Sequence, residues 1–294
     1  MPETKIASGT DRRESASGAT GEIRTLTGKN VNRKLAKMNT KDSPRNGGTP
    51  LQMLPGGKIV GALLPAWKQE MLIALFIAGA TARTAATAAF VHRHTARLWF
   101  KMLRKMLVLA RLAATALAPL TGRVEVDECY IAGGAGGKKQ AWRGRSLRGK
   151  FAIIGVECRD ENGKKHVRLA RARKVNAATI CEFIGANVAP GTRVDTDCFR
   201  GYRRLARLGY DHRTVDHSRM FKNRANGACT NGIEAAWSQF KAHLARFRGG
   251  WRHDLSAWLA EAEERIECRA GTFAARIWEL VVRFGGNRAI VKQT

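Results

Sequence analysis

Residues 123–130, RVEVDECY, decide the fold class of this chain. Val124 and Val126 alternate with Glu125 and Asp127, and a period of two predicts a strand with one apolar and one acidic face. Acids on a strand are conspicuous here, because the chain has only 24 Asp and Glu against 52 Lys and Arg. We therefore expect these carboxylates to have a purpose beyond solubility.

Two further acidic patches lie downstream, in residues 194–197 (VDTD) and 231–234 (NGIE). Alternation and turn residues predict more strands at residues 151–158, 166–172, 193–197 and 210–215. Helices are predicted at residues 176–188, at 199–208 and from 231 onward. Three strands, then helix and strand in alternation, indicate an α/β fold with a mixed sheet.

The region before the first strand is helical in pattern. Apolar periodicity predicts helices at residues 67–76, 82–89 and from 93 through 103, with Gly79 ending the first and Thr81 capping the second. This is the plan of a helix-turn-helix, whose last helix lies in the major groove of DNA. That helix would present four side chains to the groove: Arg93, His94, Arg97 and Lys101. The alternative is a small helical bundle with a solvated basic face.

The net charge limits the kinds of molecule that this protein is expected to bind. A formal charge of +28 over 294 residues favours polyanions, with nucleic acid first among them. Residues 1–58 read as a disordered basic arm, either solubilising or lying along DNA. The longest apolar run, residues 71–80, is too short to cross a bilayer, and no export signal or C-x-x-C pair is visible. We expect a cytoplasmic, nucleoid-associated protein with no membrane partner.

The three acidic patches suggest a metal site. Asp127 lies on the first strand and Asp197 at the end of the fourth, and neighbouring strands would bring these carboxylates together. Glu234 opens a helix whose apolar stripe must pack on the sheet, so Glu234 would border the same place. Carboxylate oxygens suit Mg²⁺ or Mn²⁺. Taken singly, each acid could equally be a solvated or ion-paired residue.

Four stretches together resemble a known family: VEVDECYIAGG from residue 124, a basic loop ending in Gly149-Lys150, VDTDCFRGYRRL from 194, and TNGIEAAWSQFKAHL from 230. In this order they resemble the bacterial insertion-sequence DDE transposases of the ISXO-like branch. The resemblance covers residues 122–267. Cys129 stands where a threonine is expected, and no cysteine in residues 1–60 could build the zinc ribbon with which relatives often begin.

The resemblance implies a ribonuclease H-like catalytic core with Asp127, Asp197 and Glu234 as ligands of two metal ions. It favours Asp197 over Asp195, leaves Asn231 as a rival or accessory third ligand, and gives His217 a possible accessory role. DNA would be contacted by Lys241. The basic loop would neutralise phosphates through Lys138, Lys139, Arg145 and Arg148.

The implied reaction is cleavage of transposon ends and their joining to target DNA, by a homo-oligomer in a synaptic complex. We expect a basic arm at 1–58, an all-helical helix-turn-helix domain at 59–120, the catalytic domain at 121–270 and a C-terminal helix at 271–294. Competing hypotheses are a DNA-binding regulator or inactive transposase remnant, and a nuclease of the same fold that does not join ends.

Overall fold

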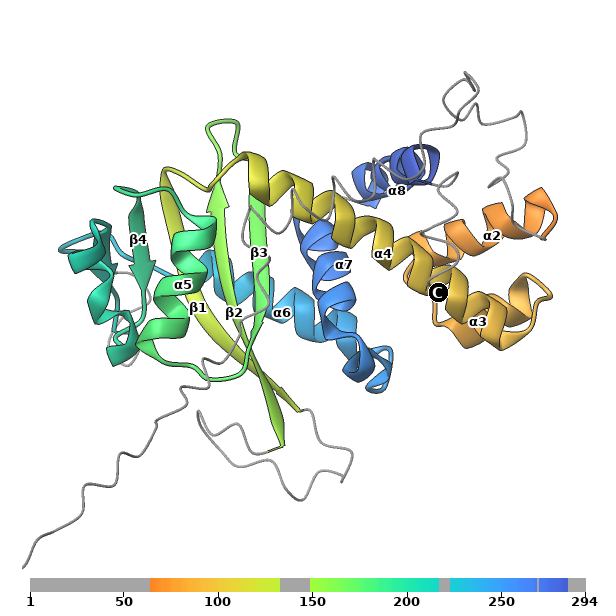
Figure 1. Ribbon diagram of the computed structural model, residues 1–294, viewed down its shortest axis with the longest axis horizontal. Helices are drawn as coiled ribbons and strands as arrows, with labels where there is room; N and C mark the ends of the chain where they lie inside the picture. The colour runs from red at the N-terminus through yellow and green to blue at the C-terminus, as the bar shows by residue number, and fades with distance from the viewer. Residues whose placement is uncertain (1–63, 133–148, 217–222, 269, 285–294) are drawn as a thin grey trace, which may run out of the picture.

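A five-stranded mixed sheet forms one end of the molecule and a group of helices the other (Figure 1). The computed structural model describes residues 64–132, 149–216, 223–268 and 270–284. The predictions for residues 1–58, for the loop cations Lys138, Lys139, Arg145 and Arg148, and for His217 lie outside these residues. No described helix is both long and apolar enough to cross a bilayer.

The sheet has the strand order β3-β2-β1-β4-β5. Strands β1 (Arg123–Ala132), β2 (Lys150–Arg159) and β3 (Lys165–Ala172) are antiparallel neighbours. Strands β4 (Arg193–Thr196) and β5 (Asp211–Thr214) then run parallel to β1. The mixed α/β sheet predicted from the sequence is confirmed.

Successive side chains of β1 point to opposite faces of the sheet, and each face packs against different helices. Val124 and Val126 are fully buried against α5 (Ala177–Asn187), whose first turn is capped by the side chain of Asn176. The other face is covered by α6 (Asn231–Ala245) and α7 (Leu255–Glu267). Figure 1 shows α5 in front of the sheet and α6 behind it. The predicted apolar stripe of α6 is buried, because Ile233, Trp237 and Phe240 pack on the strands.

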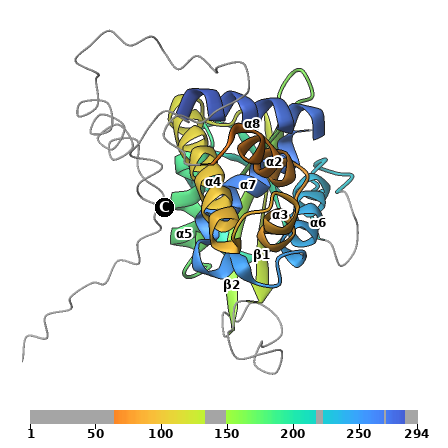
Figure 2. The ribbon, with the colours of Figure 1, turned by 90° about the vertical axis from the view of Figure 1, so that its right-hand side faces the viewer.

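The remaining helices share a second core. It joins α2 (Ala66–Ile77), α3 (Ala82–Ala88), α4 (Arg93–Leu117) and α8 (Ala270–Phe284), with Phe76, Phe100 and Phe273 near its centre. Figure 2 shows α8 lying across the top of α4 and α2. The predicted C-terminal helix therefore packs on the helices that precede the sheet. Helix α4 extends fourteen residues past the predicted end at residue 103 and reaches the sheet.

One predicted helix is wrong. Residues 199–208 form two short 3₁₀ segments, η2 (Arg200–Arg204) and η3 (Ala206–Leu208). Their backbone bonds join residues three apart, from Tyr202 N to Phe199 O and from Leu205 N to Tyr202 O. The apolar residues Phe199, Tyr202, Leu205 and Leu208 also recur every third position, which matches three residues per turn and not 3.6.

Buried ion pairs join helix α7 to helices α4 and α2. Arg104 of α4 bonds Glu261 of α7 at 2.6 Å and lies 3.5 Å from the centre of the Trp258 ring. Arg265 also bonds Glu261, at 2.8 Å, and donates to the carbonyl oxygens that end α2. Burial alone would raise the pKa of Glu261, but Arg104 holds that pKa well below its usual range. Removing one member would leave an unpaired buried charge.

Candidate active site

Register places two of the predicted acids side by side. β1 and β4 are parallel with Glu125 opposite Asp195, so Asp127 is level with Asp197, which directly follows β4. Glu234 lies in the first turn of α6, which crosses the same face of the sheet. All three side chains line one cavity of about 590 Å³. Its other lining residues are Glu128, Cys129, Tyr130, Thr230, Trp237, Ser238 and Lys241.

The indole of Trp237 fixes Asp127. Its Nε1–H donates to Asp127 Oδ2 at 3.0 Å. The ring can lie this close to the sheet because Gly155 is the β2 partner of Asp127 and has no side chain. A Cβ at Gly155 would stand 2.5 Å and 2.7 Å from two atoms of the indole. One glycine thus allows the bond that orients the carboxylate.

Asp197 and Glu234 are each held by a local donor. The backbone N–H of Phe199 donates to Asp197 Oδ1 at 2.8 Å, which fixes the side chain at the turn after β4. The hydroxyl of Thr230, just before α6, donates to Glu234 Oε1 at 2.9 Å. Each of the three carboxylates therefore has one oxygen held by a protein donor, which limits its freedom to rotate.

The carboxylates repel one another. Burial raises the pKa of Asp127 to about 7, and the negative charges of Glu128 and Asp197 add to the rise. The indole bond opposes the shift but does not cancel it. A cation among these groups would favour the ionised form of Asp127 and remove the repulsion.

Lys241 reaches the same cavity from two turns along α6. Its positive charge lies near the thiol of Cys129, a buried group whose pKa is raised to about 11 mainly by burial. A protonated thiol of this kind is inert as a nucleophile. Cys129 lies two residues from Asp127, on the same face of β1, and lines the cavity together with the lysine.

Two neighbouring acids, Glu125 and Asp195, have structural partners. Glu125 accepts hydrogen bonds from the backbone N–H groups of Gly232 and Ile233, at 2.6 Å and 3.1 Å, and so caps the start of α6. Asp195 is fully buried and bonded to Arg123 and Arg193. Neither residue is part of the cavity lining.

Glu128 is a site residue that sequence reasoning missed. It is buried, lines the cavity and accepts a 2.8 Å hydrogen bond from the hydroxyl of Tyr202, a side chain with no exposed surface. Its only sequence signal was its place directly after Asp127. Trp237 was read as a core residue, and its indole bond to Asp127 also went unpredicted.

The rival third ligand lies elsewhere. Asn231 is exposed at the start of α6 and does not line the cavity, whereas Glu234 does. Among the residues that the structure describes, no three acidic, histidine or cysteine side chains converge closely enough to hold a metal ion as placed. The donor set suits a hard divalent cation, but the three carboxylates would have to draw together to share one.

The predicted DNA-facing side chains share one surface. Arg93, His94, Arg97 and Lys101 are all exposed on the first half of α4. The cap predicted for the preceding helix is also present, since the side chain of Thr81 accepts from Thr84 N at the start of α3. The contact of this surface with DNA stays a prediction.

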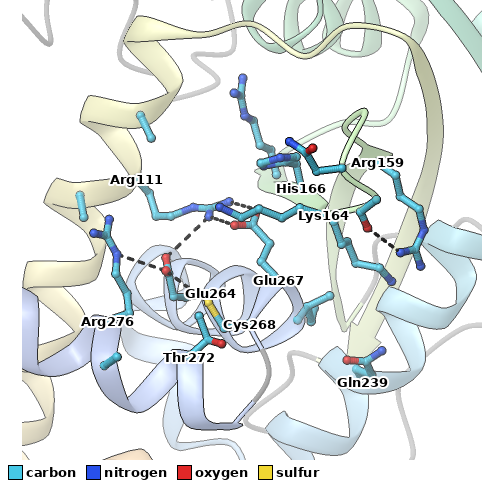
Figure 3. Close-up of a pocket in the computed structure, with 18 of the residues that line it drawn as sticks. Arg111, Arg159, Lys164, His166, Gln239, Glu264, Glu267, Cys268, Thr272 and Arg276 are labelled. Atoms are coloured by element: carbon cyan, nitrogen blue, oxygen red, sulfur yellow. Dashed lines mark hydrogen bonds and ion pairs between the residues drawn. The ribbon is translucent and has the colours of Figure 1, made fainter.

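A larger groove of about 1150 Å³ lies on the other flank of α6, between the β2–β3 turn and helices α4, α7 and α8 (Figure 3). Many of its charges are engaged with one another. Arg111 bonds Glu267 at 2.6 Å and Glu263 at 2.9 Å, and Arg276 pairs with Glu264 at 3.3 Å. We read this groove as a structural junction and not as the place of chemistry.

Comparison with known proteins identifies the class. The fold is a mixed α/β sheet with three acids lining one cavity, and the family comparison assigns the chain to the transposases. The model of the ISXO2-like transposase domain matches residues 119–263, and the chain belongs to this family of insertion-sequence transposases. The match begins after α4 and ends before α8.

One curated relative is an uncharacterized transposase-like protein of Haemophilus influenzae. It is 34% identical over 92 residues, which cover 31% of this chain and 73% of the relative. Among solved structures, a pre-cleavage Mos1 transpososome is 14% identical, with a TM-score of 0.29, over 92% of this chain and 90% of that one. The Mos1 strand transfer complex is 13% identical, with a TM-score of 0.23. Because the similarity is this low, no residue of this chain is assigned a role from these structures.

Proposed function

We propose that this transposase cleaves the ends of its insertion sequence and joins them to target DNA, with Asp127, Asp197 and Glu234 as its catalytic acids. The observation that carries the proposal is that three acids from β1, the end of β4 and α6 line one cavity. Trp237, Phe199 and Thr230 each hold one of them in place. These positions are also the ones that match the family's motifs.

The donor chemistry of the cavity fits Mg²⁺ or Mn²⁺. Three carboxylates supply hard oxygen ligands, and burial together with the negative charges of Glu128 and Asp197 raises the pKa of Asp127, a repulsion that a bound cation would remove. Two such ions would activate the attacking oxygen and stabilise the leaving oxygen. The three carboxylates would hold them, beside the buried Glu128, which accepts a hydrogen bond from Tyr202.

Other residues would bind and orient the DNA. Lys241 lines the cavity, where a phosphate of the scissile strand would need a positive charge. We assign end binding to the exposed basic face of α4, acting as the second helix of a helix-turn-helix. The loop cations near residue 140 would neutralise further phosphates, and joining two ends would require a homo-oligomer.

Strand transfer tests the proposal. The chain, duplexes copied from the two termini of its element, a supercoiled target and Mg²⁺ are combined, and joined product is measured. Asp127→Asn should abolish cleavage and joining, and Glu182→Gln, an exposed acid on α5, is the matched control. Cleavage without joining would favour the nuclease hypothesis. Binding without cleavage would favour the regulator or remnant. Equal activity of Asp127→Asn would refute the catalytic assignment.

A further inference from the structure

An exposed aromatic patch lies beside the basic face of α4. Only five large apolar side chains are markedly exposed in the described part of the chain, and three of them are Trp67, Met71 and Phe90. Trp67 and Met71 are four residues apart on α2 and so share one side of the helix. The ammonium of Lys68 lies 5.2 Å from the centre of the Trp67 ring and donates to the carbonyl oxygen of Phe90 at 2.7 Å. One lysine therefore joins both aromatic residues.

Phe90 is in an unfavourable backbone conformation. It occupies the turn between α3 and α4 with φ of +51°, in the left-handed region that bulky residues rarely adopt. Bonds from Phe90 N to Thr87 O and from Val91 N to Ala86 O define this turn. Glycine would adopt the conformation without strain.

Packing does not offset this strain. The Phe90 side chain is 76% exposed, the highest value among the exposed large apolar residues described. A phenylalanine that is both strained and exposed contributes little to folding. Strained residues of this kind gather at ligand-binding sites.

The surroundings favour a polyanion with flat faces. Between residues 64 and 101 the sequence has one acid, Glu70, against five Lys and Arg: Lys68, Arg83, Arg93, Arg97 and Lys101. Arg93 and Arg97 follow the turn directly and are exposed. A hydrophobic protein partner would not need this charge, whereas DNA offers both phosphates for the cations and stacked bases for the ring.

We propose that Phe90 inserts into the base stack of the DNA that α4 binds, while Arg93 and Arg97 contact the flanking phosphates. This inference rests on the proposed DNA-binding role of α4 and adds a local distortion of the duplex. Apolar side chains act as such wedges between base steps, unstacking and kinking the helix. A distorted step near the transposon end would help the strand enter the catalytic cavity.

The test uses the full chain and an end duplex carrying 2-aminopurine at successive positions, whose fluorescence rises when a base unstacks. Wild-type protein should raise the fluorescence at one step. Phe90→Gly should bind roughly tenfold more weakly, in line with the loss of one stacking contact, and give no rise. Its thermal stability should be unchanged or higher, because glycine relieves the strained turn. Phe90→Trp should restore the signal, and Leu208→Ala, another exposed apolar residue, should behave as wild type.

The outcomes separate the two proposals. If the wild type binds, Arg93→Ala with Arg97→Ala weakens binding, and Phe90→Gly keeps full affinity and fluorescence, the wedge is refuted and the role of α4 stands. If the double arginine variant binds as wild type does, DNA binding by α4 fails, and the wedge fails with it. If Phe90→Gly alters only the oligomeric state in light scattering, the patch is a subunit interface and the wedge is again refuted.

Discussion

Replacing Gly155 with alanine should disable the site without touching any catalytic acid. A Cβ there would stand 2.5 Å from the Trp237 ring and 2.9 Å from Leu169, where about 3.4 Å is the shortest comfortable contact. The indole would have to move away from β2 by about 1 Å. Its bond to Asp127, now 3.0 Å long, would then exceed the limit for a hydrogen bond.

Both stability and activity should fall. Overpacking a core costs about 1–3 kcal/mol, and losing a hydrogen bond to a partly ionised group adds about 1 kcal/mol. We expect Gly155→Ala to lower the free energy of unfolding by about 2–4 kcal/mol in urea titrations and to slow strand transfer at least about tenfold.

Trp237→Phe is the matched variant, since it removes the N–H donor and keeps most of the ring. It should lose activity while losing less stability than Gly155→Ala. The reasoning would be refuted if Gly155→Ala unfolded within about 0.5 kcal/mol of wild type and joined DNA at the normal rate.

Three other predictions concern charge. Asp127 has a folded-state pKa of about 7, above its unfolded value, so its stabilising contribution is present at acid pH and is lost as the pH rises through 7. Asp127→Asn should therefore raise the free energy of unfolding of the metal-free protein at pH 7.5 by about 1–3 kcal/mol in urea titrations. Mg²⁺ should abolish this gain. Glu261→Gln should destabilise the protein by about 3–5 kcal/mol in the same assay, because it leaves buried arginines unpaired, and a loss below about 1 kcal/mol would contradict this. Joint replacement of Arg93 and Arg97 by alanine should lower the slope of log affinity against log salt by about 2 in fluorescence titrations, and an unchanged slope would show that they meet no phosphates.

Sequence patterns predicted the sheet because side chains along a strand point alternately to its two faces. The alternation of Val124 and Val126 with Glu125 and Asp127 matched the two faces of β1, and the stripe on α6 matched its contact with the sheet. The pattern misled at residues 199–208, where apolar spacing of three looked helical but produced 3₁₀ turns. The length of α4 was underestimated because its second half lies against α7, whose buried glutamates accept its arginines. No local window shows partners about 150 residues apart.

The sequence identified the acidic residues of the site but not the hydrogen bonds that hold them in place. Asp127, Asp197 and Glu234 could be chosen from motif and strand position, and the structure brings them to one cavity. The bond from Trp237 to Asp127 depends on a glycine in a third element, which no spacing rule reveals. The sequence assigned Glu125 no partner, yet it caps α6, because contacts between strands and helix ends are set only by the folded chain.

The most direct measurement asks whether the three acids act as one unit. Single-turnover rates of strand transfer in Mg²⁺ are compared for Asp127→Asn, Asp197→Asn, Glu234→Gln and the triple variant, with circular dichroism to confirm folding. Groups that act together are strongly non-additive, so each single variant should fall to the same residual rate as the triple variant. Losses that multiply from one variant to the next, or a single variant that retains the wild-type rate, would contradict a shared catalytic site.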